Sequence, residues 1–377
     1  MFSNSSTSIL IKFTEHYALI HGRIVFPLTI LGILSSIVTI IVLNRKHFQT
    51  PTNLILQHVA FFDTIVLISY NIFSLYFYII HDPNPFVGQS IFWPRFAIIH
   101  SNIGLTAHTI ALWLTCLLAI IRYIIISKPK QISVNSTHVT ILIWIVVFTI
   151  CLLMIPNYLS WSVVTHPAHQ YYPHVYSENS TEIIHWVSAV TGGRLERMSF
   201  AILALCFKII PVFILIVFSV LLILNIRHAR RLHERLSRRY PSVSSSSSRL
   251  KRELRTTTML VFITLFTVLV EFPQGLFLIA AGIDKDFFSG LYSQLGDLWD
   301  ITSIGSSFIT FIMYCLMSQQ FRIEMYQIIL PKCFTKNINQ LNTKNNQSSV
   351  SITLKQKGTG TNTMLLTQVP TPIPEDL

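Results

Sequence analysis

The sequence predicts an all-α membrane protein, a seven-transmembrane helix bundle followed by a short amphipathic C-terminal helix. Three observations lead to this fold class. Hydrophobic residues make up 51% of the 377 residues and charged residues only 12%, about half the charged fraction of soluble domains. Seven apolar runs are long enough to cross the hydrocarbon core, which takes about 20 residues. Lysine and arginine gather between alternate runs, as they do on the cytoplasmic side of a membrane.

The seven runs follow a short polar tail over residues 1–23, which we expect to be extracellular. Within lipid each run must be helical, because a helix satisfies its backbone hydrogen bonds locally. The expected bundle occupies residues 24–317. Its runs cover residues 24–44, 53–80, 97–126, 139–161, 200–226, 257–283 and 291–317.

Loop charge predicts the orientation. The loop 227–255 holds ten Lys and Arg residues against two Glu residues, a net charge of 10 − 2 = +8. The first and third loops are also basic, so the odd-numbered loops are expected in the cytoplasm and the N-terminus outside. The formal net charge of +12 then reflects topology, and no nucleic-acid partner is expected. A serine run at 244–248 indicates a flexible linker. Residues 162–199 are expected to form a polar outer loop.

An amphipathic helix on the membrane surface is predicted over 318–330, where Phe321, Met325, Ile328 and Ile329 recur at helical spacing. Cys333 follows it and is a candidate for palmitoylation; the alternative is a free cytosolic thiol. Residues 331–377 are rich in Ser, Thr and Asn, which is typical of a disordered cytoplasmic tail open to phosphorylation.

Several chemistries have no sequence signal. The predicted outer loops contain no cysteine, so no structural disulfide is expected. No metal-ligand spacing and no catalytic motif is present, so neither a metal, a cofactor nor an enzymatic activity is expected. Asn4 and Asn179 head glycosylation sequons on the predicted outer side.

Ionisable residues inside the apolar runs are the candidate functional residues, because charge in hydrocarbon is costly. Glu271 lies two residues before Pro273, which removes a backbone donor and bends a helix. An acid at a helix bend indicates a segment that changes conformation. The alternative is that these residues only pair within the bundle, Glu271 with His108 or as a protonated acid. The full set is Asp63, His108, Arg122, Lys208, Glu271, Asp297 and Asp300.

Arg122 and Tyr123 end the third run on the predicted cytoplasmic side. An arginine there can extend to lipid phosphates, or it can be held in the bundle and released to a cytoplasmic partner. The spacing leaves both interpretations open.

Three stretches are specific when taken together: Asn53-Leu54 through Asp63, Trp113 through Arg122-Tyr123, and the region around Tyr314. With them the chain resembles the rhodopsin-like class of G protein-coupled receptors over residues 24–330. Within that class the chain is similar to the myosuppressin and FMRFamide-type neuropeptide receptors of invertebrates. The string Glu271-Phe272-Pro273-Gln274-Gly275 is the most specific, since most of the class has Cys-Trp-x-Pro at that bend. Other carrying residues are Asn53, Leu54, Asp63, Trp113, Arg122, Tyr123, Trp144, Pro211 and Tyr314.

The resemblance implies a plasma-membrane receptor with an extracellular peptide ligand and a heterotrimeric G protein as partners, and arrestin at the Ser/Thr-rich tail. It implies an amidated peptide ending in Arg-Phe, whose arginine pairs with Glu271 or Asp297. Three groups of residues receive roles. They are a ligand-binding group of Glu271, Gln274, Asp297, His108 and Asp300, a switch group of Arg122, Tyr123, Tyr314 and Pro273, and a buried polar network of Asp63, Ser36, Ser306 and Thr310.

The chain also departs from the class. Ile121 replaces the acid that usually precedes the arginine, so less restrains Arg122 and more of the restraint falls on the bend at Pro273. Ser36 stands where the first helix usually has an Asn, and Ala97 stands where a disulfide cysteine is usual. The usual Asn-Pro-x-x-Tyr motif reads Thr310-Phe311-Ile312-Met313-Tyr314. Two alternatives therefore stay open: a seven-helix channel or transporter, which needs a continuous polar track, and a receptor-shaped protein that does not signal.

Overall fold

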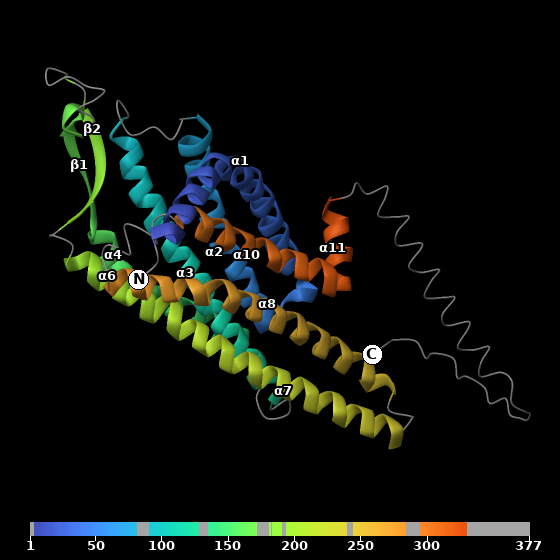
Figure 1. Cartoon of the computed structure of the whole chain (residues 1–377). Coiled ribbons are helices and arrows are strands. Elements are labelled where there is room, and N and C mark those ends of the chain that lie inside the picture. Colours follow the sequence, from blue (N-terminus) through green and yellow to red (C-terminus); the bar gives the residue numbers. More distant parts are fainter. Residues whose placement is uncertain are drawn as a thin grey trace, which may run out of the picture. The chain divides into compact units, whose positions relative to one another are not determined.

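The computed structural model describes residues 4–80, 90–127, 135–171, 181, 183–190, 194–239, 244–283 and 295–329. Within these ranges seven helical stretches are long and apolar enough to cross a membrane, which confirms the predicted all-α bundle (Figure 1). They are α1 (Asn4–Leu43), α2 (Pro51–Ser74) continued by the π-helical turn η2 (Leu75–Ile80), α3 (Phe92–Ser127), α4 (Ser136–Leu159), α6 (Arg194–Ala204) continued by the π-helical turn η4 (Leu205–Ile209) and α7 (Ile210–Arg239), α8 (Ser244–Ile283), and α10 (Gly296–Met317).

Local capping fixes two of the helix starts. Thr50 precedes α2, its side chain accepts a hydrogen bond from the Asn53 amide at 3.2 Å, and Pro51 takes the first helical position. Asn135 caps α4 in the same way, accepting from the Thr137 amide at 3.2 Å. The short 3₁₀ turn η1 (Lys46–Phe48) joins α1 to α2.

Two predicted boundaries differ from the structure. Helix α1 begins at Asn4, inside the tail expected over 1–23. Helix α8 begins at Ser244, so the prediction of a flexible linker at 244–248 is wrong. Serine is favoured where a helix starts, because its hydroxyl can satisfy the unpaired backbone amides there.

A β-hairpin lies within the region 162–199 that was expected to be a polar loop. Strand β1 (Trp161–Pro167) pairs antiparallel with β2 (Ile183–Ala189), with Trp161 opposite Ala189 and Pro167 opposite Ile183. The short helix α5 (Ala168–Tyr171) follows β1. The strands are rich in β-branched residues, which favour extended backbone, but this signal did not enter the prediction.

The hairpin identifies one end of the bundle. The Val190 amide donates to the Ser160 carbonyl at 2.8 Å, which ties the hairpin to the end of α4, and both strands contact α3. We call this the hairpin end, and the opposite end, where α3 finishes, the Arg122 end.

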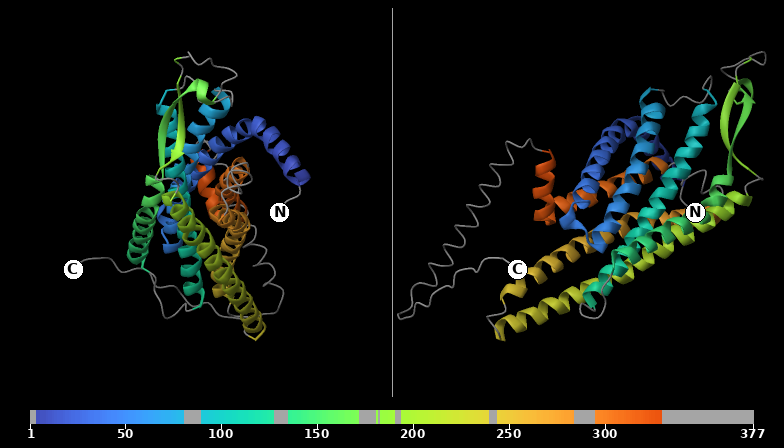
Figure 2. Two further views of the ribbon diagram at one scale, coloured as in Figure 1. Left: turned by 60° about the vertical axis from the view of Figure 1, so that its left-hand side comes forward. Right: turned by 180° about the vertical axis from the view of Figure 1, so that it is seen from behind.

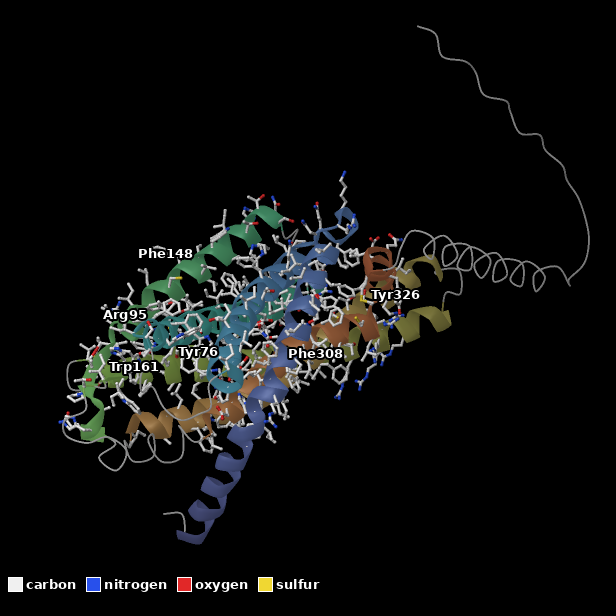
Figure 3. The ribbon with its side chains drawn as sticks, turned by 90° about the horizontal axis from the view of Figure 1, so that it is seen from above. Tyr76, Arg95, Phe148, Trp161, Phe308 and Tyr326 are labelled. Atoms are coloured by element: carbon white, nitrogen blue, oxygen red, sulfur yellow. The ribbon has the colours of Figure 1, made fainter. Side chains whose placement is uncertain are left out.

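Neighbouring helices share apolar cores. Helix α2 packs against α1 and α3, and α7 packs against α3 and α8, with which it runs side by side (Figure 2). Helix α4 packs against α3 and α6, while its Phe148 is 66% exposed and points away from the other helices (Figure 3), as expected for a side chain in lipid. The buried clusters are Val25, Leu67, Tyr70 and Ile304; Leu112, Cys116, Ala119 and Leu215; and Leu222, Ile226, Leu254 and Val261.

Helix α11 (Gln319–Ile329) matches the amphipathic helix predicted over 318–330. The chain divides into two compact units, residues 1–322 and 323–377, so the start of α11 belongs to the first unit. There Phe321 is fully buried and its ring stacks on Tyr314, with 5.1 Å between centroids. The tail 331–377, with Cys333, lies outside the described residues, as does Asn179.

Candidate functional site

Glu271 is the centre of a buried cluster of charged and polar side chains. Its carboxylate accepts a hydrogen bond from Lys208 Nζ at 2.5 Å and contacts His108 Nε2 at 2.9 Å. Lys208 also donates to the Gln274 side-chain oxygen at 2.7 Å. Glu271 is 1% exposed and Lys208 4%, so the pair is almost entirely removed from solvent. Removing one partner from such a pair leaves an uncompensated buried charge.

Three elements place this cluster. Glu271 and Gln274 come from α8, Lys208 from η4 and His108 from α3. Residues three and four positions apart share a helix face, so Gln274 and Gly275 face the same side of α8 as Glu271. A Cβ atom added to Gly275 would lie 3.1 Å from Lys208 Cβ and 3.2 Å from Ile209 Cδ1. The glycine therefore lets η4 approach α8 closely enough for Lys208 to reach both acceptors.

A second cluster of acids lies near the hairpin end, at the start of α10. Tyr78 donates its hydroxyl to Asp297 at 2.6 Å, and Tyr70 donates to Asp300 at 2.9 Å. Both acids are half-buried. Among the side chains that the structure describes, no cation pairs with either acid. Their partners are hydroxyl groups, which orient a carboxylate without neutralising its charge.

Helix α1 completes this second cluster. His21 is fully buried, and its ring nitrogens contact the Tyr70 hydroxyl at 2.9 Å and the Tyr17 hydroxyl at 3.2 Å. A Cβ atom added to the neighbouring Gly22 would collide with Tyr78, so this glycine permits the close approach of α1. The pKa of the Tyr17 phenol is raised mainly by partial burial and to a smaller extent by the nearby carboxylates of Asp297 and Asp300.

A small internal cavity of about 40 Å³ lies between Glu271 and Asp63. Asp63 is buried and is hydrogen-bonded by Ser307. Ser306 and Thr310 line the cavity as members of the predicted polar network, whereas Ser36 is buried in α1 and is not among the lining residues. A cavity of this size and polarity has room for water molecules.

Three of the four predicted switch residues, Arg122, Tyr123 and Tyr314, lie at the Arg122 end. Arg122 is 6% exposed and Tyr314 is 4% exposed, stacked on Phe321. The buried Tyr314 hydroxyl makes no hydrogen bond within the described part of the chain. Tyr123 contacts the ring of Phe218 edge to face at 5.7 Å. Pro273 lies within α8, which passes through it as one helix.

The sequence-predicted residues thus fall into separate places. Glu271, Gln274 and His108 come together, while Asp297 and Asp300 belong to the other cluster. The pairing of Glu271 with His108, considered as an alternative, is observed. Lys208 was among the candidate residues because it lies inside an apolar run, but its pairing with Glu271 and Gln274 was not predicted. Tyr70 and Tyr78 were not predicted as partners of Asp300 and Asp297, because tyrosine is common near both surfaces of a membrane.

Cysteines and metal ligands add no further site to these clusters. Cys116, Cys151, Cys206 and Cys315, the four cysteines in the described ranges, are free thiols. Across the same ranges no group of three or more His, Cys, Asp or Glu residues is arranged to hold a metal ion. Asn4 begins α1, and its glycosylation stays a prediction.

Comparison with known proteins adds an independent line of evidence. The model of the family described as "Serpentine type 7TM GPCR chemoreceptor Srw" matches residues 23–332. "G-protein coupled receptor dmsr-1" of Caenorhabditis elegans is 26% identical over 371 residues, covering 86% of this chain and 70% of that protein. The "Sex peptide receptor" of Drosophila melanogaster is 26% identical, covering 85% and 75%. The "FMRFamide receptor" of the same fly is 24% identical, covering 80% and 52%.

Proposed function

Because this chain belongs to the family of serpentine seven-transmembrane G protein-coupled receptors, we propose that it binds an extracellular neuropeptide at the plasma membrane and activates a heterotrimeric G protein. The family is one of signalling receptors, not of enzymes. The names of two relatives, a sex peptide receptor and an FMRFamide receptor, support a peptide ligand. The excess of Lys and Arg in the odd-numbered loops supports an extracellular N-terminus and hairpin end.

The ligand we propose is an amidated peptide that ends in Arg-Phe. One observation carries this proposal: Asp297 and Asp300 have tyrosine hydroxyls as partners and no cation among the described side chains. Their negative charge is available to a ligand, and a charge-assisted bond to arginine is strong where water is scarce. Glu271, by contrast, already holds Lys208. Of the two carboxylates predicted to bind the arginine, the contacts favour Asp297.

Binding at the hairpin end must favour the active arrangement, since a ligand shifts an equilibrium only by its difference in affinity for the two states. In the proposed active arrangement the Arg122 end of α8 moves away and Arg122 meets the G protein. The tail 331–377, with its many Ser and Thr residues, is the proposed arrestin-binding segment after phosphorylation. Palmitoylation of Cys333 would attach the start of this tail to the inner leaflet.

The test is G protein activation in cells that express the full chain and receive a panel of amidated peptides. Peptides that activate the receptor are resynthesised with citrulline, a neutral isostere, in place of arginine. We expect citrulline and the substitution Asp297→Asn each to lower potency by about 10- to 100-fold, since hydrogen bonds to charged groups contribute roughly 1.5–3 kcal/mol.

Combining the two changes should then cost little more than either one, because both remove the same ion pair. Additive losses would show that the arginine binds elsewhere. If Asp297→Asn leaves potency unchanged, the proposed arginine site is wrong. Silence toward every peptide of the panel would count against the peptide ligand itself.

A further inference from the structure

Lys208 occupies the place that a cationic ligand would need at Glu271. Its ammonium group lies 2.5 Å from one carboxylate oxygen and 2.7 Å from the Gln274 oxygen, while His108 takes the other carboxylate oxygen at 2.9 Å. Both carboxylate oxygens are therefore occupied by side chains of the protein. The Glu-x-Pro-Gln-Gly string is explained by this cation: two of its residues accept from Lys208, and Gly275 makes room for η4.

The cluster lies where α8 is most easily bent, next to Pro273. Pro273 has no amide hydrogen, so the Leu269 carbonyl, four residues earlier, lacks its helical partner and the helix is easily bent at this point. Glu271 and Gln274 flank that position on either side. Lys208 and His108 therefore fasten α8 to η4 and α3 at its most deformable point.

Toward the Arg122 end, α8 is held by apolar packing and by hydrogen bonds, which include the exposed bonds from Arg230 to the Thr258 hydroxyl at 3.3 Å and from Arg255 to the Leu316 carbonyl at 3.5 Å. Leu254 and Val261 pack on Leu222 and Ile226 of α7 in an apolar cluster, and Ser219 and Thr264 share a hydroxyl hydrogen bond at 2.9 Å. Apolar packing is non-directional and can be re-formed after a displacement. Separating an ion pair in low dielectric leaves two poorly compensated buried charges, which is strongly unfavourable. The charged cluster is thus the contact that most restrains α8.

We propose that Lys208 is the switch residue of this receptor: it holds Glu271 and Gln274 in the resting arrangement, and activation requires that α8 separate from η4 at this pair. The proposal rests on the proposed function, because it assumes that the chain signals. It assigns the resting-state restraint to the apolar span of α8 rather than to the Arg122 end, in a chain whose Arg122 is preceded by Ile121 rather than an acid.

The first experiment measures basal G protein signalling, divided by the amount of receptor at the cell surface, in Lys208→Met, Glu271→Gln and the double variant. We expect each to raise basal signalling about tenfold, the change in equilibrium constant that about 1.4 kcal/mol produces. The double variant should match the single ones, because all three remove one interaction. The charge exchange Lys208→Glu with Glu271→Lys should return basal signalling toward the original level.

Ser219→Ala is the matched control, since it removes a polar contact between the same two helices nearer the Arg122 end. It should change basal signalling far less than Lys208→Met does. Unchanged basal signalling per receptor in Lys208→Met, in a chain that responds to a peptide, would overturn the proposal. Should Lys208→Met not reach the surface, Glu271→Gln carries the same test with the same two outcomes.

A second readout does not depend on G protein coupling. Leu254 is buried at the Arg122 end of α8, 7% exposed. A cysteine placed there by Leu254→Cys reacts with a thiol reagent faster when α8 moves away from α7, measured against the same chain without that cysteine. Adding Lys208→Met should raise this rate about tenfold, and an unchanged rate would refute the switch. Faster labelling in a chain that never signals would support the switch while counting against the proposed function.

Discussion

The two acid clusters of this bundle use the same residue chemistry in opposite ways. Glu271 is paired with Lys208 and His108 and has a 1% exposed side chain, whereas Asp297 and Asp300 are half-buried beneath the hydroxyls of Tyr78 and Tyr70. A lysine cancels the charge of a carboxylate; a tyrosine hydroxyl only orients it. The first acid therefore has a lysine of the protein as its partner, whereas the second pair has hydroxyl partners and no cation among the described side chains.

The two kinds of partner match the two proposed roles, a restraint at Glu271 and ligand binding at Asp297. Charge in hydrocarbon is costly in both cases, but only the Glu271 cluster contains a lysine among the described side chains that balances it. This comparison makes predictions that separate the two clusters by the size of their contributions to stability.

The largest expected effect is on the Glu271 cluster. Lys208→Met should lower the stability of the purified receptor by about 3–5 kcal/mol, because it leaves a buried carboxylate with too little compensation. Thermal unfolding in detergent micelles measures this, and the double variant with Glu271→Gln should recover most of the loss. A loss as large from Asp297→Asn would erase the distinction between the clusters.

A smaller effect is expected at the glycine that lets η4 approach. Gly275→Ala should cost about 1–3 kcal/mol of stability through overpacking, because the new Cβ would lie 3.1 Å from Lys208 Cβ. Gly305→Ala is the matched control, since a Cβ there meets nothing within 4 Å. Equal thermal shifts in the two variants would show that the close approach is not needed.

The smallest effect is expected at the tyrosine-capped acids. Tyr78→Phe removes the 2.6 Å hydrogen bond to Asp297, but that carboxylate is half-buried and water can replace the hydroxyl. We expect a loss of about 1 kcal/mol in the same unfolding measurement. If Tyr78→Phe costs as much as Lys208→Met, a hydroxyl partner and a lysine partner are equivalent here and the comparison fails.

Much of the fold could be predicted because lipid imposes simple rules. Long apolar runs must be helices, and the amphipathic spacing around Phe321 was enough for α11. The hairpin was missed because its strands interrupt a polar segment between helices. The serine run at the start of α8 was misread because low-complexity composition was weighed above the preference of serine for helix starts.

The functional residues could be found one by one, but their partners could not. The cost of charge in lipid identifies Glu271, Lys208, Asp297 and Asp300 without any structure. Lys208 and Glu271 are 63 positions apart, and Tyr78 and Asp297 are 219 apart. Nothing in a single sequence relates positions at such distances.

The sequence by itself determined the seven helices, the family, and the set of costly polar residues inside them, because each depends on composition and spacing along the chain. Only the tertiary structure decided which acid has a lysine as its partner and which has a tyrosine hydroxyl. That decision depends on how closely η4 approaches α8 at Gly275 and α1 approaches η2 at Gly22, and such distances are set by packing between helices rather than by the order of residues within one.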